Sequence, residues 1–322
     1  MTDPPGGREA PDRETPKQRV AYWTYRSGEW LAMTLPEGVG RRTFELLGRV
    51  AHRTLHGVRQ TVTRNQAEVL GVDPASELAA SATREAFHLY ARYWYDTFRI
   101  RVLPDEEVLR RTEAHGIEHI DRALEAGRGC IAVLPHIGNW DLAGHWLAVR
   151  GYPIAAVAEE LRPERLFRLF LRHREELGLR IVPLVKGEHV GQRLAGLLAD
   201  DWVVALVADR DLSGRGVPVE MFGRRRMLPP GPALLSLSTG APLLVCSVWT
   251  TPTGWGIWVG PPLRLERSGV LREDVAELTR RVGAGFERAI AAHPTDWHMF
   301  QPAWDEAPQP ATAAGDAAGR RG

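Results

Sequence analysis

Short apolar runs alternate with amphipathic segments from residue 129 onward, and this alternation is the feature that most limits the possible folds. The apolar runs lie at 129–135, 152–159, 180–185, 201–209, 241–250 and 254–265. Segments with a helical apolar period lie at 139–150, 162–177, 189–199, 231–239 and 270–292. Buried strands separated by helices are typical of an α/β fold. The alternation therefore predicts a mixed, largely parallel central sheet with helices on both faces.

The part of the chain before residue 128 predicts helices instead of strands. Apolar residues recur there at helical spacing near 19–35, 41–55, 74–99 and 116–127. We expect this helical region to cap the sheet within a single domain at 19–305, with the cap at 19–127 and the sheet core at 128–305. The ends, 1–18 and 306–322, are rich in Pro, Gly, Ala and charge, which predicts disordered tails.

Composition and residue spacing argue against several classes of function. The formal net charge of +1 gives no bulk electrostatic case for nucleic acid. Cys130 and Cys246 lie inside apolar runs and match no zinc, redox or disulfide spacing, so they predict buried free thiols. No apolar stretch reaches the roughly 18 residues needed to span a bilayer, and no histidine spacing suggests a metal site. We expect no metal and no cofactor, and the sequence leaves the oligomeric state open.

The stretch LPHIGNWDLAG carries a histidine and an aspartate where an apolar strand gives way to a helix. His136 and Asp141 would point about 140° apart on a continuous helix. Gly138 permits a bend between them, and Asn139 is a good N-cap. Asp141 would then reach back to one imidazole nitrogen and leave the other as a general base, at the carboxyl end of a strand where α/β sites form. The alternative is a structural turn with a satisfied histidine.

A second polar cluster follows the apolar run at 201–209. Asp209, Arg210 and Asp211 stand together at the end of that run, before a glycine-bearing loop. Two carboxylates beside an arginine suit a site that binds an anion and tunes a base. A salt bridge that closes the strand explains the cluster equally well.

Arginine-rich segments suggest contacts with anions or with a membrane. Arg224, Arg225 and Arg226 form a cluster that suits the phosphates of a ligand, although a solvated basic loop fits as well. The helix at 162–177 interleaves Arg with Leu and Phe, which fits either an interfacial helix on anionic lipid or a packed helix with snorkelling arginines. The aromatic segment 20–33 is a second candidate for membrane contact.

Three segments together resemble a known family: PHIGNWDLAG, ALVADRDLSGRGVPVEMFG and the closing AAHPTDWHMFQPAW. They are similar to the bacterial lipid A biosynthesis (late) acyltransferases, and within that family to the actinobacterial phosphatidylinositol mannoside acyltransferases. The resemblance extends from about residue 18 to 305 and includes TRNQAEVLGV and VAEELRPERLFRLFLRHREELG. It implies a glycerolipid acyltransferase-like fold.

The resemblance also implies roles for individual residues. His136 would be the general base and Asp141 its orienting partner. Asp209 would be a catalytic carboxylate, in a stretch that reads ADRDL where an AERDL-like sequence is expected, so its side chain is one methylene shorter. Glu159 and Arg174 match polar positions that line the family's site.

The implied reaction is direct acyl transfer, in which a mannose hydroxyl of a phosphatidylinositol mannoside attacks the thioester of acyl-CoA as His136 takes its proton. Backbone N–H groups at 136–141 or a nearby arginine would stabilise the oxyanion. Partners would be acyl-CoA, a membrane glycolipid and an anionic membrane surface, with peripheral attachment to the cytoplasmic face of the plasma membrane. We expect aromatic residues of 19–35 and 74–99 to line the groove for the acyl chain.

Two alternatives stay open. One keeps the reaction and changes the acceptor to another glycolipid or a lysophospholipid, and the other is a non-catalytic lipid-binding protein on the same scaffold. The remaining histidines near these motifs, His145, His293 and His298, are expected to pack and not to react.

Overall fold

The structure is a computed structural model that describes residues 14–160, 162–184, 189–212 and 214–304. The expected disordered tails at 1–18 and 306–322 lie outside these residues, apart from 14–18. There the expectation is wrong, because the first helix begins at Pro16 with Thr15 as its N-cap, whose side chain accepts a hydrogen bond from the Gln18 N–H.

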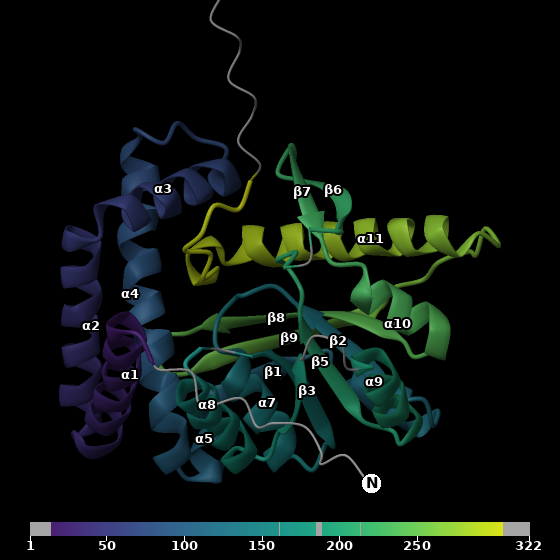
Figure 1. Cartoon of the computed structure of the whole chain (residues 1–322), viewed down its shortest axis with the longest axis horizontal. Helices are drawn as coiled ribbons and strands as arrows, with labels where there is room; N and C mark the ends of the chain where they lie inside the picture. Colours follow the sequence, from purple (N-terminus) through teal and green to yellow (C-terminus); the bar gives the residue numbers. More distant parts are fainter. Residues whose placement is uncertain (1–13, 161, 185–188, 213, 305–322) are drawn as a thin grey trace, which may run out of the picture.

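A helical cap is confirmed, but it is shorter than the expected 19–127, because residues 112–115 form a strand of the sheet and residues 118–125 pack on the sheet. Its helices are α1 (Pro16–Thr34), α2 (Glu37–Thr54), α3 (His56–Leu70) and α4 (Glu77–Arg99). They stand together beside the sheet, at the left of Figure 1, with α4 packed against each of the other three. Gly48 permits the close approach of α2 to α4, because a Cβ there would lie 2.9 Å from the Phe87 carbonyl oxygen.

The predicted α/β class is confirmed by the sheet. Within the described residues its strands, in spatial order, are β1 (Thr112–His115), β9 (Trp255–Pro262), β8 (Leu243–Thr250), β2 (Cys130–Leu134), β5 (Val203–Val207), β3 (Ile154–Glu159) and β4 (Arg180–Leu184). Each neighbouring pair is parallel except the antiparallel pair β8–β9. Strand β1 was not predicted, nor was a separate antiparallel hairpin of β6 (Val217–Met221) and β7 (Arg224–Leu228).

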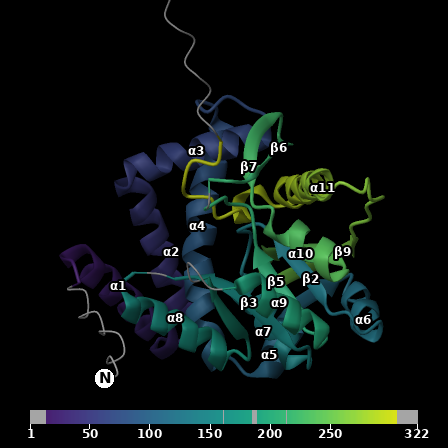
Figure 2. The ribbon, with the colours of Figure 1, turned by 45° about the vertical axis from the view of Figure 1, so that its right-hand side comes forward.

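Helices cover both faces of the sheet (Figures 1 and 2). One apolar cluster joins the sheet to α9 (Val190–Ala199), α10 (Gly231–Thr239) and α11 (Leu271–Ala292), and another joins it to α6 (Glu118–Glu125) and α7 (Trp140–Val149). Side chains of β2 alternate between them: Ile131 and Val133 enter the first cluster, and Cys130, Ala132 and Leu134 enter the second. The strand is buried throughout, as its continuous apolar run predicts.

Helix α8 (Glu164–Glu176) lies between the cap and the sheet edge at β4. Its residues Leu166 and Phe170 are buried, and Phe167 and Leu171 are partly buried against the core. Of the two explanations for its arginine-rich pattern, the packed helix is therefore the one that the structure bears out.

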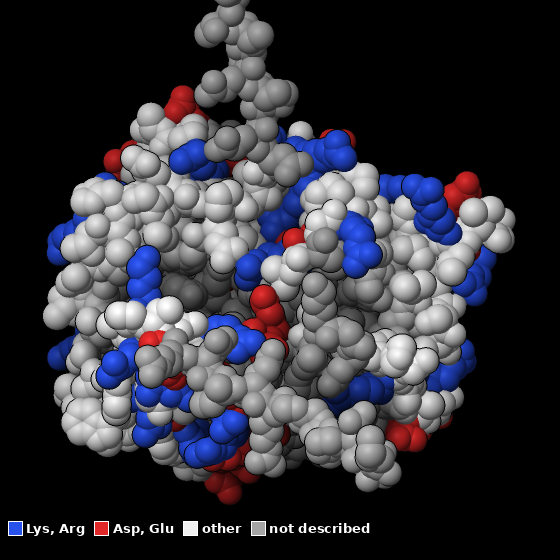
Figure 3. Space-filling view, in the orientation of Figure 1, with Lys and Arg blue, Asp and Glu red and all other residues white. Residues whose placement is uncertain are grey.

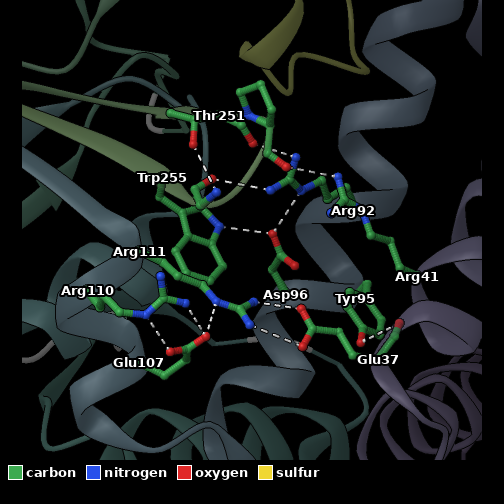
Figure 4. A network of polar contacts seen from close by, with 12 residues as sticks. Glu37, Arg41, Arg92, Tyr95, Asp96, Glu107, Arg110, Arg111, Thr251 and Trp255 are labelled. Carbon is green, nitrogen blue, oxygen red and sulfur yellow. Dashed lines mark hydrogen bonds and ion pairs between the residues drawn. The ribbon is translucent and has the colours of Figure 1, made fainter.

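A polar network fixes the cap to the sheet core, and Figure 4 shows it at close range. Arg92 of α4 donates hydrogen bonds to the carbonyl oxygens of Thr251 and Gly254, at 2.8 and 3.2 Å. The Trp255 indole donates to Asp96 of the same helix at 2.9 Å. These contacts join α4 to the β8–β9 connection, at the end of the sheet where the functional motifs also lie.

Candidate active site

The strand ends bring His136 and Asp209 together. Strands β2 and β5 are parallel neighbours, and their last residues, Leu134 and Val207, are paired in register. Each motif residue lies two positions beyond its paired residue, so both leave the same edge of the sheet side by side. The predicted location at the carboxyl ends of strands is thus confirmed.

The turn after β2 has the predicted geometry. Gly138 has φ of +57°, and a Cβ there would lie 2.3 Å from the Val248 carbonyl oxygen, so the position needs glycine. The Asn139 side chain accepts a hydrogen bond from the Leu142 N–H at 2.9 Å and starts α7 at Trp140. His136 is held in this turn with its side chain 24% exposed.

The partner of the imidazole is Asp209. The distance from His136 Nδ1 to Asp209 Oδ1 is 2.5 Å, and the Trp297 indole N–H donates to Oδ2 at 2.9 Å. The Arg226 guanidinium donates to the backbone carbonyl oxygen of Asp209. Asp209 itself is fully buried.

The electrostatics of this group keep Asp209 ionised. Burial by itself would raise the pKa of Asp209, but the imidazole of His136, the Arg226 charge and the Trp297 hydrogen bond hold that pKa well below its usual range. An ionised carboxylate only accepts hydrogen bonds, so Nδ1 carries the proton in the neutral imidazole. His136 Nε2 is then left with its lone pair, as a general base requires.

Asp141 was expected to orient the imidazole of His136, but it does not contact that imidazole in the structure. Asp141 is buried in the first turn of α7, where its two oxygens face Arg174 of α8, at 2.7 Å from Nε and 3.4 Å from Nη2. The guanidinium of Arg174 binds the carboxylate of Asp141 in bidentate geometry. The imidazole of His136 contacts Asp209 instead, because the pairing of β2 with β5 places the two residues side by side. Asp141 and Arg174 instead form a charged pair that lines the same cavity as His136.

The C-terminal segment also contributes to the site, through contacts to which the sequence analysis assigned no residues. The His298 N–H donates to the carbonyl oxygen of His136 at 2.7 Å, and the Gly138 N–H donates to that of Asp296 at 3.0 Å. Together with the indole of Trp297, these bonds hold both the turn and its carboxylate. The DWHMFQP sequence, which lies within one of the three segments that carry the family resemblance, was the available signal.

The predicted packing roles of two other histidines are confirmed. His145 is buried and its Nδ1 lies 2.9 Å from the Leu177 carbonyl oxygen. His293 stacks on Trp249, with ring centroids 4.6 Å apart. His298 is also buried and packs, with its ring centroid 5.0 Å from that of Tyr93. It lines a cavity together with His136, and burial lowers its pKa to about 3, so it stays neutral.

Two cavities of unlike chemistry meet at His136. The larger, about 730 Å³, is mostly apolar and is lined from β2, β3, β5, α7 and α10. The smaller, about 230 Å³, is lined by aromatic side chains of α1 and α4 and by the C-terminal segment. His136, Trp140, Arg174 and Arg210 line both. On the face seen in Figure 3 a hollow lies between the cap and the sheet core, with charged side chains of both signs at its rim.

The aromatic residues that were expected to line the groove for the acyl chain lie at the smaller cavity. The helices expected at 19–35 and 74–99 supply Tyr25, Tyr90, Tyr93 and Trp94 to the smaller cavity, and the larger one is built from the sheet and its own helices. Glu159 is exposed at the end of β3 and lines the larger cavity.

The predicted arginine cluster at 224–226 does not exist as a cluster. The three residues form β7, so alternate side chains point to opposite faces of the hairpin. Arg226 is buried against Asp209, Arg224 lies 2.5 Å from Glu68, and Arg225 is exposed. Arg226 is thus part of the support of the site and is unavailable to a phosphate.

The cysteines are buried free thiols, as predicted. Burial raises the pKa of Cys130 to about 12 and that of Cys246 further still, so neither is a thiolate nucleophile. Within the described ranges, no helix is long and apolar enough to cross a membrane.

A buried carboxylate, an oriented imidazole and an apolar cavity at the strand ends of an α/β sheet define a site suited to acyl transfer. Residues 9–306 match the family described as bacterial lipid A biosynthesis acyltransferase, and the chain belongs to that family. A phosphatidylinositol mannoside acyltransferase of Mycobacterium tuberculosis is 41% identical over 298 residues, which are 91% of each chain. A protein of the same name from Mycolicibacterium smegmatis is 38% identical over 281 residues, 87% of this chain and 90% of its own.

These findings confirm the family inferred from the motifs. The chain is an acyltransferase enzyme of a lipid-biosynthesis family.

Proposed function

We propose that this acyltransferase moves a fatty acyl group from acyl-CoA to a mannose hydroxyl of a phosphatidylinositol mannoside. The observation that carries the proposal is the position of His136, whose imidazole is oriented by Asp209 and stands where two cavities of unlike chemistry meet. The names of the similar mycobacterial proteins support this choice of acceptor.

The larger cavity is assigned to the acyl chain of the donor. Its lining from β2, β3 and β5 is almost entirely aliphatic, so transfer of an acyl chain from water into it is favourable. The polar residues Glu159 and Arg210 also line this cavity and would face the more polar part of acyl-CoA.

The smaller cavity is assigned to the sugar of the acceptor. Tyr90, Tyr93 and Trp140 present aromatic rings there, and the centroids of Tyr93 and Trp140 lie 4.7 Å apart. Flat rings with a few polar groups suit the faces and hydroxyls of a mannose. The imidazole of His136 lines the same cavity and would meet one of those hydroxyls.

In the proposed reaction, His136 Nε2 takes the proton of the mannose hydroxyl as its oxygen attacks the thioester carbon. The new C–O bond forms a tetrahedral oxyanion, whose collapse breaks the C–S bond. The imidazolium then returns the proton to the departing thiolate, giving the ester and free CoA. Asp209 stabilises the imidazolium throughout, because it is ionised and in contact with Nδ1.

An arginine is the better donor to the oxyanion. In the turn at 136–141, the N–H groups of Ile137 and Gly138 already bond to the carbonyl oxygens of Pro135 and Asp296. We assign the role to Arg210, which lines both cavities, since Arg174 is held by Asp141.

We assign the membrane contact to α1 and α2. Large apolar side chains on these helices are exposed: Val20, Trp23, Trp30, Val39, Leu46, Leu47 and Val50. An exposed apolar stripe beside arginines suits peripheral binding to an anionic membrane surface, here at the cytoplasmic face of the plasma membrane. Helix α8 is not assigned this role, because its apolar face is buried.

The test incubates purified protein with palmitoyl-CoA and a phosphatidylinositol mannoside and follows release of free CoA. His136→Ala should slow release by about 10²- to 10⁴-fold, whereas His115→Ala, at an exposed position on β1, should leave it unchanged. Release of CoA only with another glycolipid or a lysophospholipid would show that the acceptor is a different lipid and that the reaction is still acyl transfer. Lipid binding without release from any acceptor would favour the non-catalytic alternative and refute the mechanism.

A further inference from the structure

A cavity of about 510 Å³ lies in the helical cap, where α2, α3 and α4 meet. It shares no lining residue with the two cavities at His136, and the proposed reaction does not use it. Four arginines line it: Arg49, Arg53, Arg59 and Arg84. Two histidines and two glutamates complete the lining, and their contacts decide whether the cavity carries excess positive charge.

The glutamates do not neutralise the arginines that line the cavity. Glu45 lies 3.6 Å from His88 Nε2 and 3.5 Å from Arg41, and Glu85 lies 3.4 Å from His88 Nδ1. The hydrogen bonds and charges of these carboxylates raise the pKa of His88, so the three groups form a local cluster of their own. Arg41 lies outside the cavity lining.

The arginines have few anionic partners of their own. Arg84 lies 2.8 Å from Glu77, and Arg59 donates to the backbone carbonyl oxygen of His52 at 3.2 Å. Within residues 14–160, 162–184, 189–212 and 214–304, neither Arg49 nor Arg53 lies within 4.0 Å of a carboxylate. The cavity therefore concentrates guanidinium groups with unused donors.

The electrostatic environment of His52 reflects the positive charge of these arginines. The His52 ring lines the cavity and lies edge-on against Phe87, with centroids 5.4 Å apart. Burial first, and then the charges of Arg59, Arg84 and Arg53, lower the pKa of His52. An anion bound among the guanidinium groups would remove part of that repulsion.

We propose that this arginine-lined cavity binds a phosphate group of a ligand. Guanidinium forks match phosphate oxygens in bidentate geometry, and they keep their charge at any physiological pH. The volume lies in the range of ligand sites, about 300–1,000 Å³. Leu46 and Val50 flank Arg49 along α2 and are 54% and 45% exposed, so an apolar strip adjoins the arginines. That neighbourhood favours the phosphate of an anionic phospholipid over free phosphate.

The test follows the imidazole signals of selectively labelled histidine by NMR, with His52→Gln used to assign His52. Sodium phosphate and short-chain dihexanoyl phosphatidate are titrated separately against sodium chloride of equal ionic strength. Either probe should move the His52 signal and raise its pKa by about 1, as expected for an opposite charge brought near.

The discriminating variant is Arg49→Gln with Arg53→Gln, which should weaken the response to the probe by about tenfold or more. The matched control, Arg42→Gln with Arg64→Gln, removes two exposed arginines from α2 and α3 outside the cavity and should respond like wild type. A response to phosphatidate alone supports a lipid source, and a response to phosphate as well supports the bare anion. No response to either probe, or equal weakening in both double variants, overturns the proposal.

Discussion

The indole of Trp297 is predicted to matter to catalysis through a single hydrogen bond. Its N–H donates to Asp209 Oδ2 at 2.9 Å, while the other oxygen contacts His136 Nδ1. Trp297→Phe keeps a buried ring and deletes that donor. A hydrogen bond to a charged group is worth about 1.5–3 kcal/mol, and each 1.36 kcal/mol is a factor of ten in rate. If Asp209 loses its fixed orientation, kcat should fall about 10- to 100-fold.

The Michaelis constant for acyl-CoA should stay unchanged, because Trp297 lines neither cavity at His136. CoA release measured against acyl-CoA concentration separates the two constants. Trp304→Phe is the matched control. The Trp304 ring lies 6.1 Å from that of Trp297, both rings face Arg226, and the Trp304 Nε1 has no hydrogen-bond partner in the described part of the chain. Equal losses in both variants, or full activity of Trp297→Phe, would refute the reasoning.

Two further predictions concern buried carboxylates. Asp209→Asn should lower kcat by about 10²- to 10⁴-fold. It should also lower the free energy of unfolding in urea by about 3–5 kcal/mol, because Arg226 keeps a buried charge without its counter-charge. Unchanged CoA release would contradict the assigned role. Burial raises the pKa of Asp296 to about 6 from an ordinary 3.8, so the folded state binds that proton more tightly and loses stability as pH rises from about 4 to 6. Asp296→Asn lacks this titration, so its stability relative to wild type should improve by about 2 kcal/mol between pH 4 and pH 7, and a constant difference across that range would count against it.

The fold was predictable because local patterns specify it. The buried strand at Cys130–Leu134 and the start of α7 after Asn139 both follow from residues within a few positions of each other. Register between strands is different, since it depends on residues about 70 positions apart. Sequence proximity favoured Asp141 as the partner of His136, but the pairing of β2 with β5 decides in favour of Asp209.

The arginines at 224–226 illustrate the same limit. The two-residue turn at Phe222 and Gly223, both with positive φ, closes a hairpin. Its first strand alternates apolar and exposed positions, but its second strand begins with three arginines and lacks the apolar alternation of a half-buried strand. Without that period the segment resembles a basic loop. Only the packing of the hairpin on α11 turns Arg226 toward the core and separates it from Arg225.

The geometry also shows how the shorter aspartate side chain reaches His136 where the family resemblance implies glutamate. Parallel neighbours lie about 4.8 Å apart, and His136 and Asp209 leave β2 and β5 at equivalent positions, so the short side chain already reaches Nδ1 at 2.5 Å. A longer side chain would have to fold back within a fully buried position enclosed by Trp297 and Arg226. The shorter side chain therefore keeps its contact with His136, because the register of the two strands brings the residues close enough.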